Sequence, residues 1–289
     1  MKGGKAISVL PVVLILVFLA VAADAPKLTF KFTTIEVKGA QDTRVFGTNN
    51  LPVMVGAYVD SNGLTHGFMR KGTKVTTIDD PNGTTTNCVG INTAGDIVGY
   101  YTSSSGLVLG FMRHAGKFTD LAPSGSQLAE ALGINDKGQV AGYFVDSGSV
   151  THGFLLNGKK YKQLDVPGAT GTLAWGINNS GMVAVQWIDS SGNSESAIYN
   201  GKTYKTINVP GAVGSYAHGI NSVGDVVYSW TDSTGLFHGA LRTGGKVYKY
   251  NDPKGTDGTY GDGINDHRLV VGVYHTSGGA VAEGFKASY

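Results

Sequence analysis

The chain has 289 residues, of which 41% are hydrophobic and 15% charged, with 23 basic against 21 acidic side chains. A chain of this length can bury a sizeable core. Its near-neutral balance, with lysines scattered along the sequence, excludes the concentrated basic surface that nucleic-acid binding requires. The single cysteine, Cys88, excludes an internal disulfide framework.

The first segment predicts export. Lys2 and Lys5 precede an apolar run from Ala6 to Ala23, and the small residues Ala20 and Ala22 suit a signal peptidase. We predict a signal peptide over residues 1–22, after which no membrane association is expected. The alternative is a retained anchor, because about 18 apolar residues can just span a bilayer. The predicted location is the periplasm or the extracellular space.

The rest of the chain repeats one unit. The triplet Gly-Ile-Asn recurs at spacings of 43 or 44 residues, preceded by a weaker Gly-Thr-Asn copy. The triplets start at Gly47, Gly90, Gly133, Gly176, Gly219 and Gly263. Turn residues divide each unit into four strand candidates, for example 139–145, 150–156, 161–166 and 172–178. Four strands in about 43 residues indicate one blade of a β-propeller.

The two ends of the repeated region are complementary. Residues 31–36 match residues 74–79, which form the fourth strand of a unit, whereas residues 263–289 supply only the first three strands. We therefore predict an all-β fold in which residues 23–289 form a single domain, a six-bladed β-propeller of four-stranded blades, closed by an N-terminal strand that completes the last blade. An open solenoid is the alternative, although it would gain nothing from complementary half-repeats.

Five motifs recur in these units: Gly-Ile-Asn-x-x-Gly, Val-x-Gly-Tyr, Asp-Ser-x-Gly, His-Gly-Phe and Asp-x-Pro-Gly-Ala. Together they resemble the HAF-type extracellular repeat proteins of bacteria over residues 30–289. The resemblance implies an exported repeat protein and carries no catalytic residues. The sequence departs from the pattern at Glu195-Ser196-Ala197, where the third unit has His152-Gly153-Phe154, and at Leu109 in place of a histidine.

Residues that recur in most units are interpreted as structural. The asparagine of each triplet suits the first position of a turn, where its side chain bonds its own backbone. The hairpin aspartates occur once per loop, too few for calcium, which predicts a turn role; they are Asp60, Asp146, Asp189 and Asp232. Cys88 occupies a position that is small in other units and is predicted to be buried.

Three histidines occupy the same third-strand position in alternate blades: His66, His152 and His238. A third strand lies roughly 10 Å further from the axis than the first, so these imidazoles cannot share a zinc ion. We predict instead that each bonds a neighbouring group between blades. No metal and no cofactor is expected.

A ligand site need exist only once, so we look for it where the units differ. The residue before each triplet is Phe46, Val89, Leu132, Trp175, His218 or Asp262. The same side of the ring carries the unusual Trp187, Glu195 and Trp230. The candidate ligand-binding residues are therefore Trp175, His218, Asp262, Trp187, Glu195 and Trp230. The alternative is sequence drift in a tolerant layer between blades.

Two functions fit this pattern. The first is an exported binding or scaffold protein that holds a carbohydrate, a peptide or a protein partner, because an aromatic platform beside polar groups suits such ligands. The second is a hydrolase or lyase acting on an extracellular polymer, with His218, Asp262 and Glu195 as acid/base groups. No nucleophile motif such as Gly-x-Ser-x-Gly is present. The oligomeric state is left open.

Overall fold

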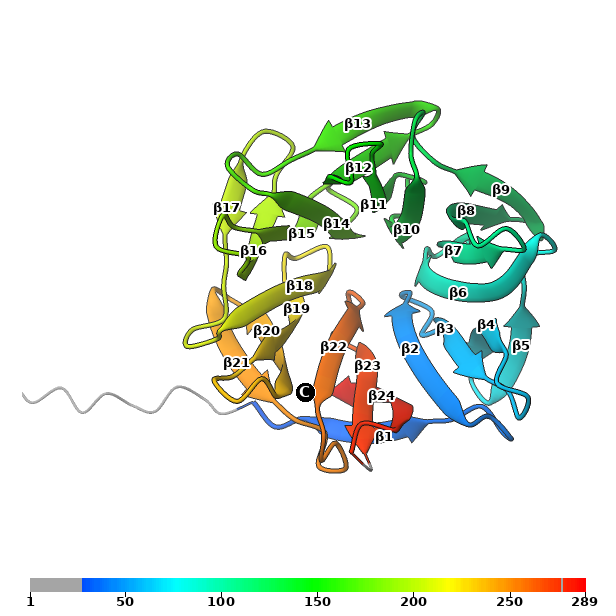
Figure 1. Ribbon diagram of the computed structural model, residues 1–289. Helices are drawn as coiled ribbons and strands as arrows, with labels where there is room; N and C mark the ends of the chain where they lie inside the picture. Colours follow the sequence, from blue (N-terminus) through cyan, green and yellow to red (C-terminus); the bar gives the residue numbers. More distant parts are fainter. Residues whose placement is uncertain (1–27, 277) are drawn as a thin grey trace, which may run out of the picture.

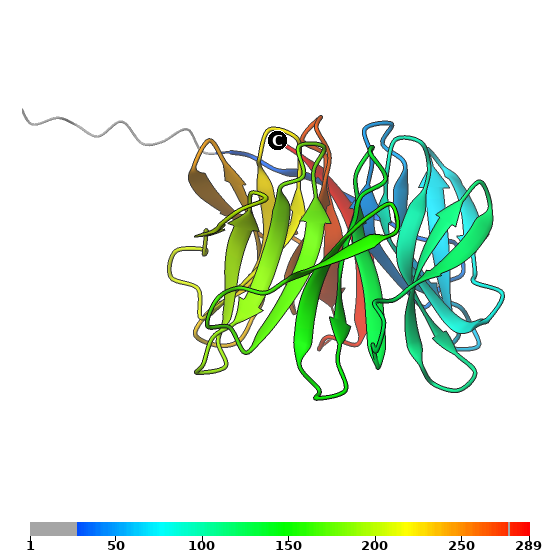
Figure 2. The same ribbon diagram turned by 90° about the horizontal axis from the view of Figure 1, so that it is seen from above.

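The computed structural model describes residues 28–276 and 278–289, so the predicted signal peptide lies outside the described residues. Six antiparallel sheets of four strands surround one axis (Figure 1). Seen from the side, the strands of each blade run between the two faces of the ring (Figure 2). The predicted six-bladed propeller is confirmed. In the described part of the chain no helix is long and apolar enough to cross a membrane.

Each blade places its strands at four radii. The innermost strands are β2 (Asp42–Thr48), β6 (Gly83–Ile91), β10 (Leu128–Ile134), β14 (Gly171–Ile177), β18 (Gly214–Ile220) and β22 (Thr259–Ile264). The second strands are β3 (Met54–Val59), β7 (Ile97–Ser103), β11 (Val140–Val145), β15 (Val183–Ile188), β19 (Val226–Thr231) and β23 (Val270–Thr276). The third strands are β4 (Thr65–Lys71), β8 (Val108–His114), β12 (Thr151–Asn157), β16 (Ser194–Tyr199), β20 (Phe237–Thr243) and β24 (Val281–Ser288). The outermost strands are β5 (Lys74–Ile78), β9 (Lys117–Leu121), β13 (Lys160–Leu164), β17 (Tyr204–Thr206), β21 (Lys246–Tyr250) and β1 (Lys31–Ile35).

The ring closes through the first strand. β1 pairs antiparallel with β24, so that Phe32 lies opposite Ala287 and the last blade has the order β1-β24-β23-β22. Phe32 packs edge-on against Phe285 at 5.3 Å between ring centroids, and both belong to the core that also buries Tyr250. The predicted closure is therefore confirmed, and β24 has no unpaired edge.

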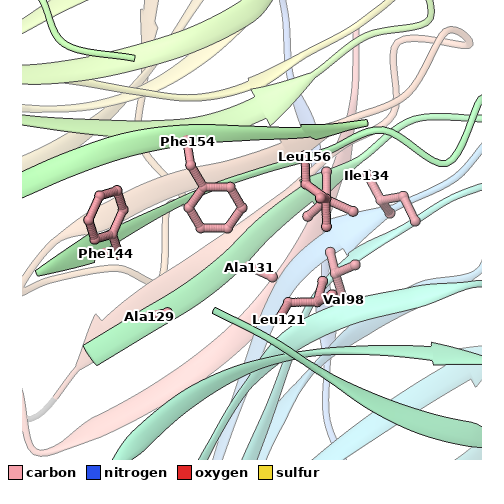
Figure 3. Packing of buried hydrophobic residues seen from close by; sticks show 9 residues of the cluster. Val98, Leu121, Ala129, Ala131, Ile134, Phe144, Phe154 and Leu156 are labelled. Carbon is pink, nitrogen blue, oxygen red and sulfur yellow. The ribbon is translucent and has the colours of Figure 1, made fainter. Parts of the chain in front are cut away.

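The hydrophobic core lies between the blades. Figure 3 shows one such layer, where Val98 and Leu121 of the second blade meet residues of the third, including Ala131, Phe154 and Leu156. Small and large side chains alternate across this layer, which lets neighbouring sheets approach closely. Cys88 belongs to a similar layer and is fully buried, and burial raises the pKa of its thiol. The prediction for Cys88 is confirmed.

The triplet glycines allow the innermost strands to touch. A Cβ atom on Gly133 would lie 2.4 Å from the carbonyl oxygen of Trp175, and one on Gly176 would lie 2.5 Å from that of His218. The glycines of all six triplets lie equally close to the carbonyl oxygen of the pre-glycine residue in the next blade. Each inner strand also has a shift in its pairing register at this point, as between Ala131 and Gly133. Only glycine fits there, because any side chain would push neighbouring blades apart.

The triplet asparagines form a closed ring of hydrogen bonds. Asn178 accepts from the backbone N–H groups of Ser180 and Met182, which confirms the predicted turn role. Its side-chain amide also donates to the carbonyl oxygen of Asn221 in the next blade at 2.9 Å. The same inter-blade bond recurs six times and returns from Asn265 to Asn49; the donors are Asn49, Asn92, Asn135, Asn178, Asn221 and Asn265. The period of 43 residues therefore also encodes contact between blades.

In three of the six blades the hairpin aspartate and the third-strand histidine form a clasp. The Asp146 carboxylate accepts from the N–H groups of Gly148 and Val150, and it lies 3.3 Å from His152 Nε2. The Nδ1 atom of His152 meets Asp165, at the end of the outermost strand, at 3.0 Å. The turn role of the aspartates is confirmed. The prediction that the histidines bond between blades is wrong, because the hairpin aspartate and the next strand of the same blade already reach both ring nitrogens.

Candidate functional site

The central channel is divided by the middle residues of the triplets. Five isoleucines and one threonine line both the cavity above and the cavity below this level. We call them the isoleucine collar; its members are Thr48, Ile91, Ile134, Ile177, Ile220 and Ile264. The five isoleucines are 6–7% exposed, so the collar is an apolar constriction. The two ends of the channel are therefore separate sites.

The first end, which we call the variable mouth, holds a cavity of about 100 Å³. Its walls are the pre-glycine residues Phe46, Val89, Leu132, Trp175, His218 and Asp262. They come from the C-terminal parts of the inner strands, which converge on the axis in Figure 1. The volume corresponds to about three water molecules, so a larger ligand can enter only with one edge.

Trp175, His218 and Asp262 lie side by side along this wall. The ring centroids of Trp175 and His218 are 4.4 Å apart, and the indole N–H donates to the Gln186 side-chain oxygen at 3.2 Å. His218 Nδ1 lies 3.2 Å from an Asp262 carboxylate oxygen. The side chains of His218 and Asp262 are only 12% and 16% exposed. Neighbouring inner strands thus hold an aromatic ring, an imidazole and a carboxylate in a row.

The contacts of His218 fix its tautomer. Nδ1 lies 2.9 Å from the carbonyl oxygen of Gly261, and a carbonyl oxygen only accepts, so Nδ1 carries the proton. Nε2 has no hydrogen-bond partner among the described residues. In the neutral imidazole this nitrogen is an acceptor, so the row presents one aromatic face and one free acceptor to a ligand.

The other predicted residues lie elsewhere. Trp187 and Glu195 face each other on β15 and β16, the second and third strands of the fourth blade, and Glu195 accepts a hydrogen bond from Asn208. Trp230 is 8% exposed, stacks on His238 at 4.5 Å and donates to the carbonyl oxygen of Gly239. None of the three lines the cavity of the variable mouth. The acid/base set His218, Asp262 and Glu195 therefore does not assemble.

A second layer of differing residues lies two positions before the first layer. It consists of Arg44, Asn87, Glu130, Leu173, Tyr216 and Tyr260. These residues are half-buried on the innermost strands. The sequence comparison missed this layer because it considered only the position before each triplet, although the same test of variation between units would have identified it.

Charge and aromatic character are separated in this layer. Arg44, Asn87 and Glu130 belong to the first three blades, whereas Leu173, Tyr216 and Tyr260 belong to the last three. The aromatic half is continuous, since Phe237 lies between Tyr216 and Tyr260 at 5.5 Å and 4.6 Å. The second layer thus has a charged side and an aromatic side, although none of its residues lines the cavity of the variable mouth.

Glu130 is the most perturbed carboxyl group of this second layer. Burial raises the pKa of Glu130 to about 7, although hydrogen bonding to Tyr143 opposes the shift. Tyr143 lies directly opposite Glu130 in the β10–β11 pair. Burial and the nearby Glu130 charge also raise the pKa of Tyr143 and of Tyr100.

The second end of the channel, the asparagine mouth, is closed by its own hydrogen bonds. Residues that follow the triplets form a polar crown above the asparagine ring; they are Asn50, Thr93, Asp136, Asn179, Ser222 and Asp266. Asp136 accepts from the Thr93 backbone and the Asn179 side chain, and the former bond helps to lower the pKa of Asp136. Asp266 accepts from Ser222 in the same way. These carboxylates already have partners, so the crown is a structural element.

Known proteins share the architecture but little sequence. No protein-family model matches the chain, and no curated protein sequence matches it. The structure is similar to the fungal lectin of Aleuria aurantia, described as a six-bladed β-propeller with a fucose recognition mode (TM-score 0.54, 13% identity, 86% of this chain and 91% of that chain). It is also similar to AofleA of Arthrobotrys oligospora (TM-score 0.55, 11% identity, 85% and 83%).

A third similar structure is a prolyl endopeptidase (TM-score 0.50, 15% identity, 83% of this chain and 40% of that chain). At such identities the likeness concerns the fold alone, and this fold hosts both binding proteins and enzymes. The functional assignment therefore has to come from the variable mouth itself.

Proposed function

We propose that the protein binds carbohydrate at the variable mouth. The observation that carries this proposal is the row of Trp175, His218 and Asp262 in three consecutive blades. An indole face packs on the apolar C–H face of a sugar ring, while a fixed acceptor and a carboxylate bond its hydroxyl groups. The similarity to fungal lectins with fucose-related ligands supports the proposal at the level of architecture.

The small cavity sets the mode of binding. With about 100 Å³ above the collar, only one edge of a sugar ring can enter. The remainder of the ring would stay outside this cavity, toward the open end of the channel. A terminal sugar residue therefore suits the mouth better than an internal residue of a chain.

We also propose that the protein is exported and belongs with the HAF-type repeat proteins. The apolar segment before residue 23 and the recurring motifs support this part of the proposal. Sequencing the N-terminus of the protein recovered from the periplasm and the medium tests it. A mature chain that begins close to residue 23 is expected, and an intact Met1 in every fraction contradicts it.

Carbohydrate binding is tested by titrating the protein with a panel of monosaccharides, L-fucose included, in a calorimeter. We expect saturable binding of at least one sugar, and Trp175→Ala should weaken it about tenfold or more, because the stacking surface is lost. Tyr161→Ala is the matched control, since this aromatic residue is 37% exposed on the outer strand β13. Wild-type protein that binds no sugar, or equal affinity of the Trp175→Ala variant, contradicts the proposal.

A further inference from the structure

The turns between the third and the outermost strands carry lysines in every blade where the chain forms such a turn. We call these turns the outer hairpins; they span residues 71–74, 114–117, 157–160, 199–204 and 243–246. In the last blade the two ends of the chain meet at the same place, where Lys31 lies opposite Ser288. Lysine is the first residue of five of the six outermost strands, and the outer hairpin of the fourth blade contains one as well. We call these six residues the rim lysines: Lys31, Lys74, Lys117, Lys160, Lys202 and Lys246.

The rim lysines lie at the face of the ring that carries the asparagine mouth. Because the strands of a blade are antiparallel, its outer hairpin is at the same end as the turn that contains the triplet asparagine. In the second blade, His114 of the outer hairpin lies 2.6 Å from Asp96 of the asparagine turn. Figure 2 shows the two faces between which the strands run. Lysines that are scattered along the sequence therefore surround one mouth in the structure.

These lysines are exposed and lack ionic partners. All six are exposed, and no carboxylate oxygen of the described residues lies within 4.0 Å of a lysine ammonium group. The nearby carboxylates of Asp136 and Asp266 are occupied by hydrogen bonds of the polar crown. A lysine on an edge strand can keep that edge from pairing with another chain. That role alone predicts no affinity for an anionic partner, so the two roles can be separated by experiment.

The opposite face, around the variable mouth, carries negative charge instead. The hairpins between the second and third strands contain Asp60, Asp146, Asp189 and Asp232. Backbone N–H groups lower the pKa of Asp60 and of Asp146, which keeps both ionised at neutral pH. An inner strand of seven residues such as β10 spans about 24 Å. This exceeds the Debye length of about 8 Å at physiological ionic strength, so each face meets a charged partner independently of the other.

The spacing of the rim lysines favours an extended anionic plane as the partner. An outermost strand lies three strand spacings, about 14 Å, further from the axis than the innermost strand of its blade. The outer hairpins of different blades are therefore too far apart to share one compact anion. A linear polyanion would follow only some of the blades, whereas a plane can meet all six. A planar partner also explains why the lysine recurs in every blade, while a small ligand needs its contacts only once.

Apolar side chains on the same face suit the surface of a lipid bilayer. Leu51 and Val223 occupy equivalent positions in the asparagine turns of the first and fifth blades, and they are 57% and 72% exposed. A bilayer interface accepts apolar side chains beside lysines, whereas a hydrophilic polymer offers them no burial. The apolar tips of the opposite face, such as Leu64 and Val150, stand beside the hairpin aspartates, which anionic lipids would repel.

We infer that the face around the asparagine mouth docks on the surface of a bilayer that contains anionic lipids. The rim lysines contact the headgroups, and Leu51 and Val223 enter the interface. The variable mouth then points away from the bilayer and remains open to a ligand. The sequence predicts no membrane association for the mature chain, because the ring of lysines forms only when the blades close. This inference does not depend on sugar binding.

The experiment uses residues 23–289, because every strand and every core cluster of the ring lies within residues 28–289. Co-sedimentation with vesicles of equal parts phosphatidylglycerol and phosphatidylcholine is compared with pure phosphatidylcholine vesicles. We expect binding to the anionic vesicles to be about tenfold or more tighter, and to weaken as salt is raised, since salt screens exposed charges. Thermal melting verifies that the wild type and all variants are folded.

Charge reversal at two rim lysines is the decisive substitution. Lys74→Glu/Lys160→Glu should weaken binding to the anionic vesicles about tenfold or more, whereas Lys74→Arg/Lys160→Arg should bind like the wild type. The matched control is Lys38→Glu/Lys254→Glu, which changes the net charge equally. Both control lysines are exposed in loops that follow outermost strands, at the opposite face. This control should keep the wild-type affinity.

Several results would overturn the inference. One is equal binding of the wild type to both kinds of vesicle. Another is an equal loss in both glutamate variants, which would reflect net charge alone. Wild-type affinity of Lys74→Glu/Lys160→Glu would show that the rim lysines only protect strand edges. Salt-sensitive stacking of the protein on itself without vesicle binding would assign the lysines to the acidic face of a second copy. A lack of sugar binding would refute the proposed function and leave this inference standing.

Discussion

The two ends of the central channel are built from the same strands but follow opposite rules. At the asparagine mouth every blade supplies the same amide, and six identical hydrogen bonds link the blades into a ring. At the variable mouth no two blades supply the same residue at the pre-glycine position. A repeat protein needs its inter-blade contacts six times and its ligand contacts once, so repetition marks the scaffold and divergence marks the candidate site.

The largest loss of stability is expected when one hydrogen bond of the asparagine ring is removed. Asn178→Ala removes the bond to Asn221 and leaves the N–H groups of Ser180 and Met182 without their acceptor. We expect a loss of about 3 kcal/mol in the free energy of unfolding, because buried polar groups are left unsatisfied. Urea denaturation followed by circular dichroism measures it.

Asn200→Ala is the matched control. This asparagine also accepts from two backbone N–H groups, of Lys202 and Thr203, but it lies in an exposed turn. It should cost about 1 kcal/mol or less, since water replaces the lost acceptor. Equal losses for Asn178 and Asn200 would show that the inter-blade ring adds nothing to the turn.

At Glu130 in the second layer we expect a smaller change in the free energy of unfolding, and one of opposite sign, because its replacement should stabilise the protein. The pKa of Glu130 is about 7 in the folded protein against a reference value of 4.5. Between these values the folded chain holds a proton that the unfolded chain has released, so wild-type stability falls as the pH rises. Glu130→Gln lacks this loss and should be more stable than wild type by about 2 kcal/mol near pH 8, with the advantage vanishing in acid.

Thermal melts of both proteins across this pH range test the Glu130 prediction. A difference that stays constant with pH would mean that Glu130 titrates at its ordinary value.

The smallest effect is expected at the isoleucine collar. Thr48 is its one polar member, and Thr48→Ile would make the first blade like the other five. Burying the added apolar surface should stabilise the protein by about 0.5 to 1 kcal/mol. A lower urea midpoint would instead show that the collar has no room for a sixth isoleucine, which is the overpacking case.

Much of the fold could be predicted from the sequence because its period is regular. The spacing of the triplets predicts four-stranded blades of about 43 residues, and the match of residues 31–36 to residues 74–79 predicts that the first strand completes the last blade. The structure confirms both predictions. The positions of Trp175, His218 and Asp262 next to one another also followed from their common place before the triplet. Their role in binding stays a prediction.

The sequence was less informative about side chains away from the axis. Trp187, Glu195 and Trp230 were grouped with the site because they are unusual in the same blades, yet β-strand alternation and radius place them elsewhere. Likewise His152 looked like a link between blades, whereas its partners Asp146 and Asp165 lie in its own blade. Deviation from a repeat identifies a residue but not the direction of its side chain.

The sequence by itself determined the blade, the number of blades and the closure, because a repeat that buries its surface only against its neighbours must show its period in the order of residues. Only the tertiary structure decided which groups meet. It joined six asparagines into one ring, divided the channel at the isoleucine collar, and placed Glu130 between tyrosines of two blades without a cation. Such contacts depend on the radius and the twist of strands far apart in the chain, and no local pattern records them.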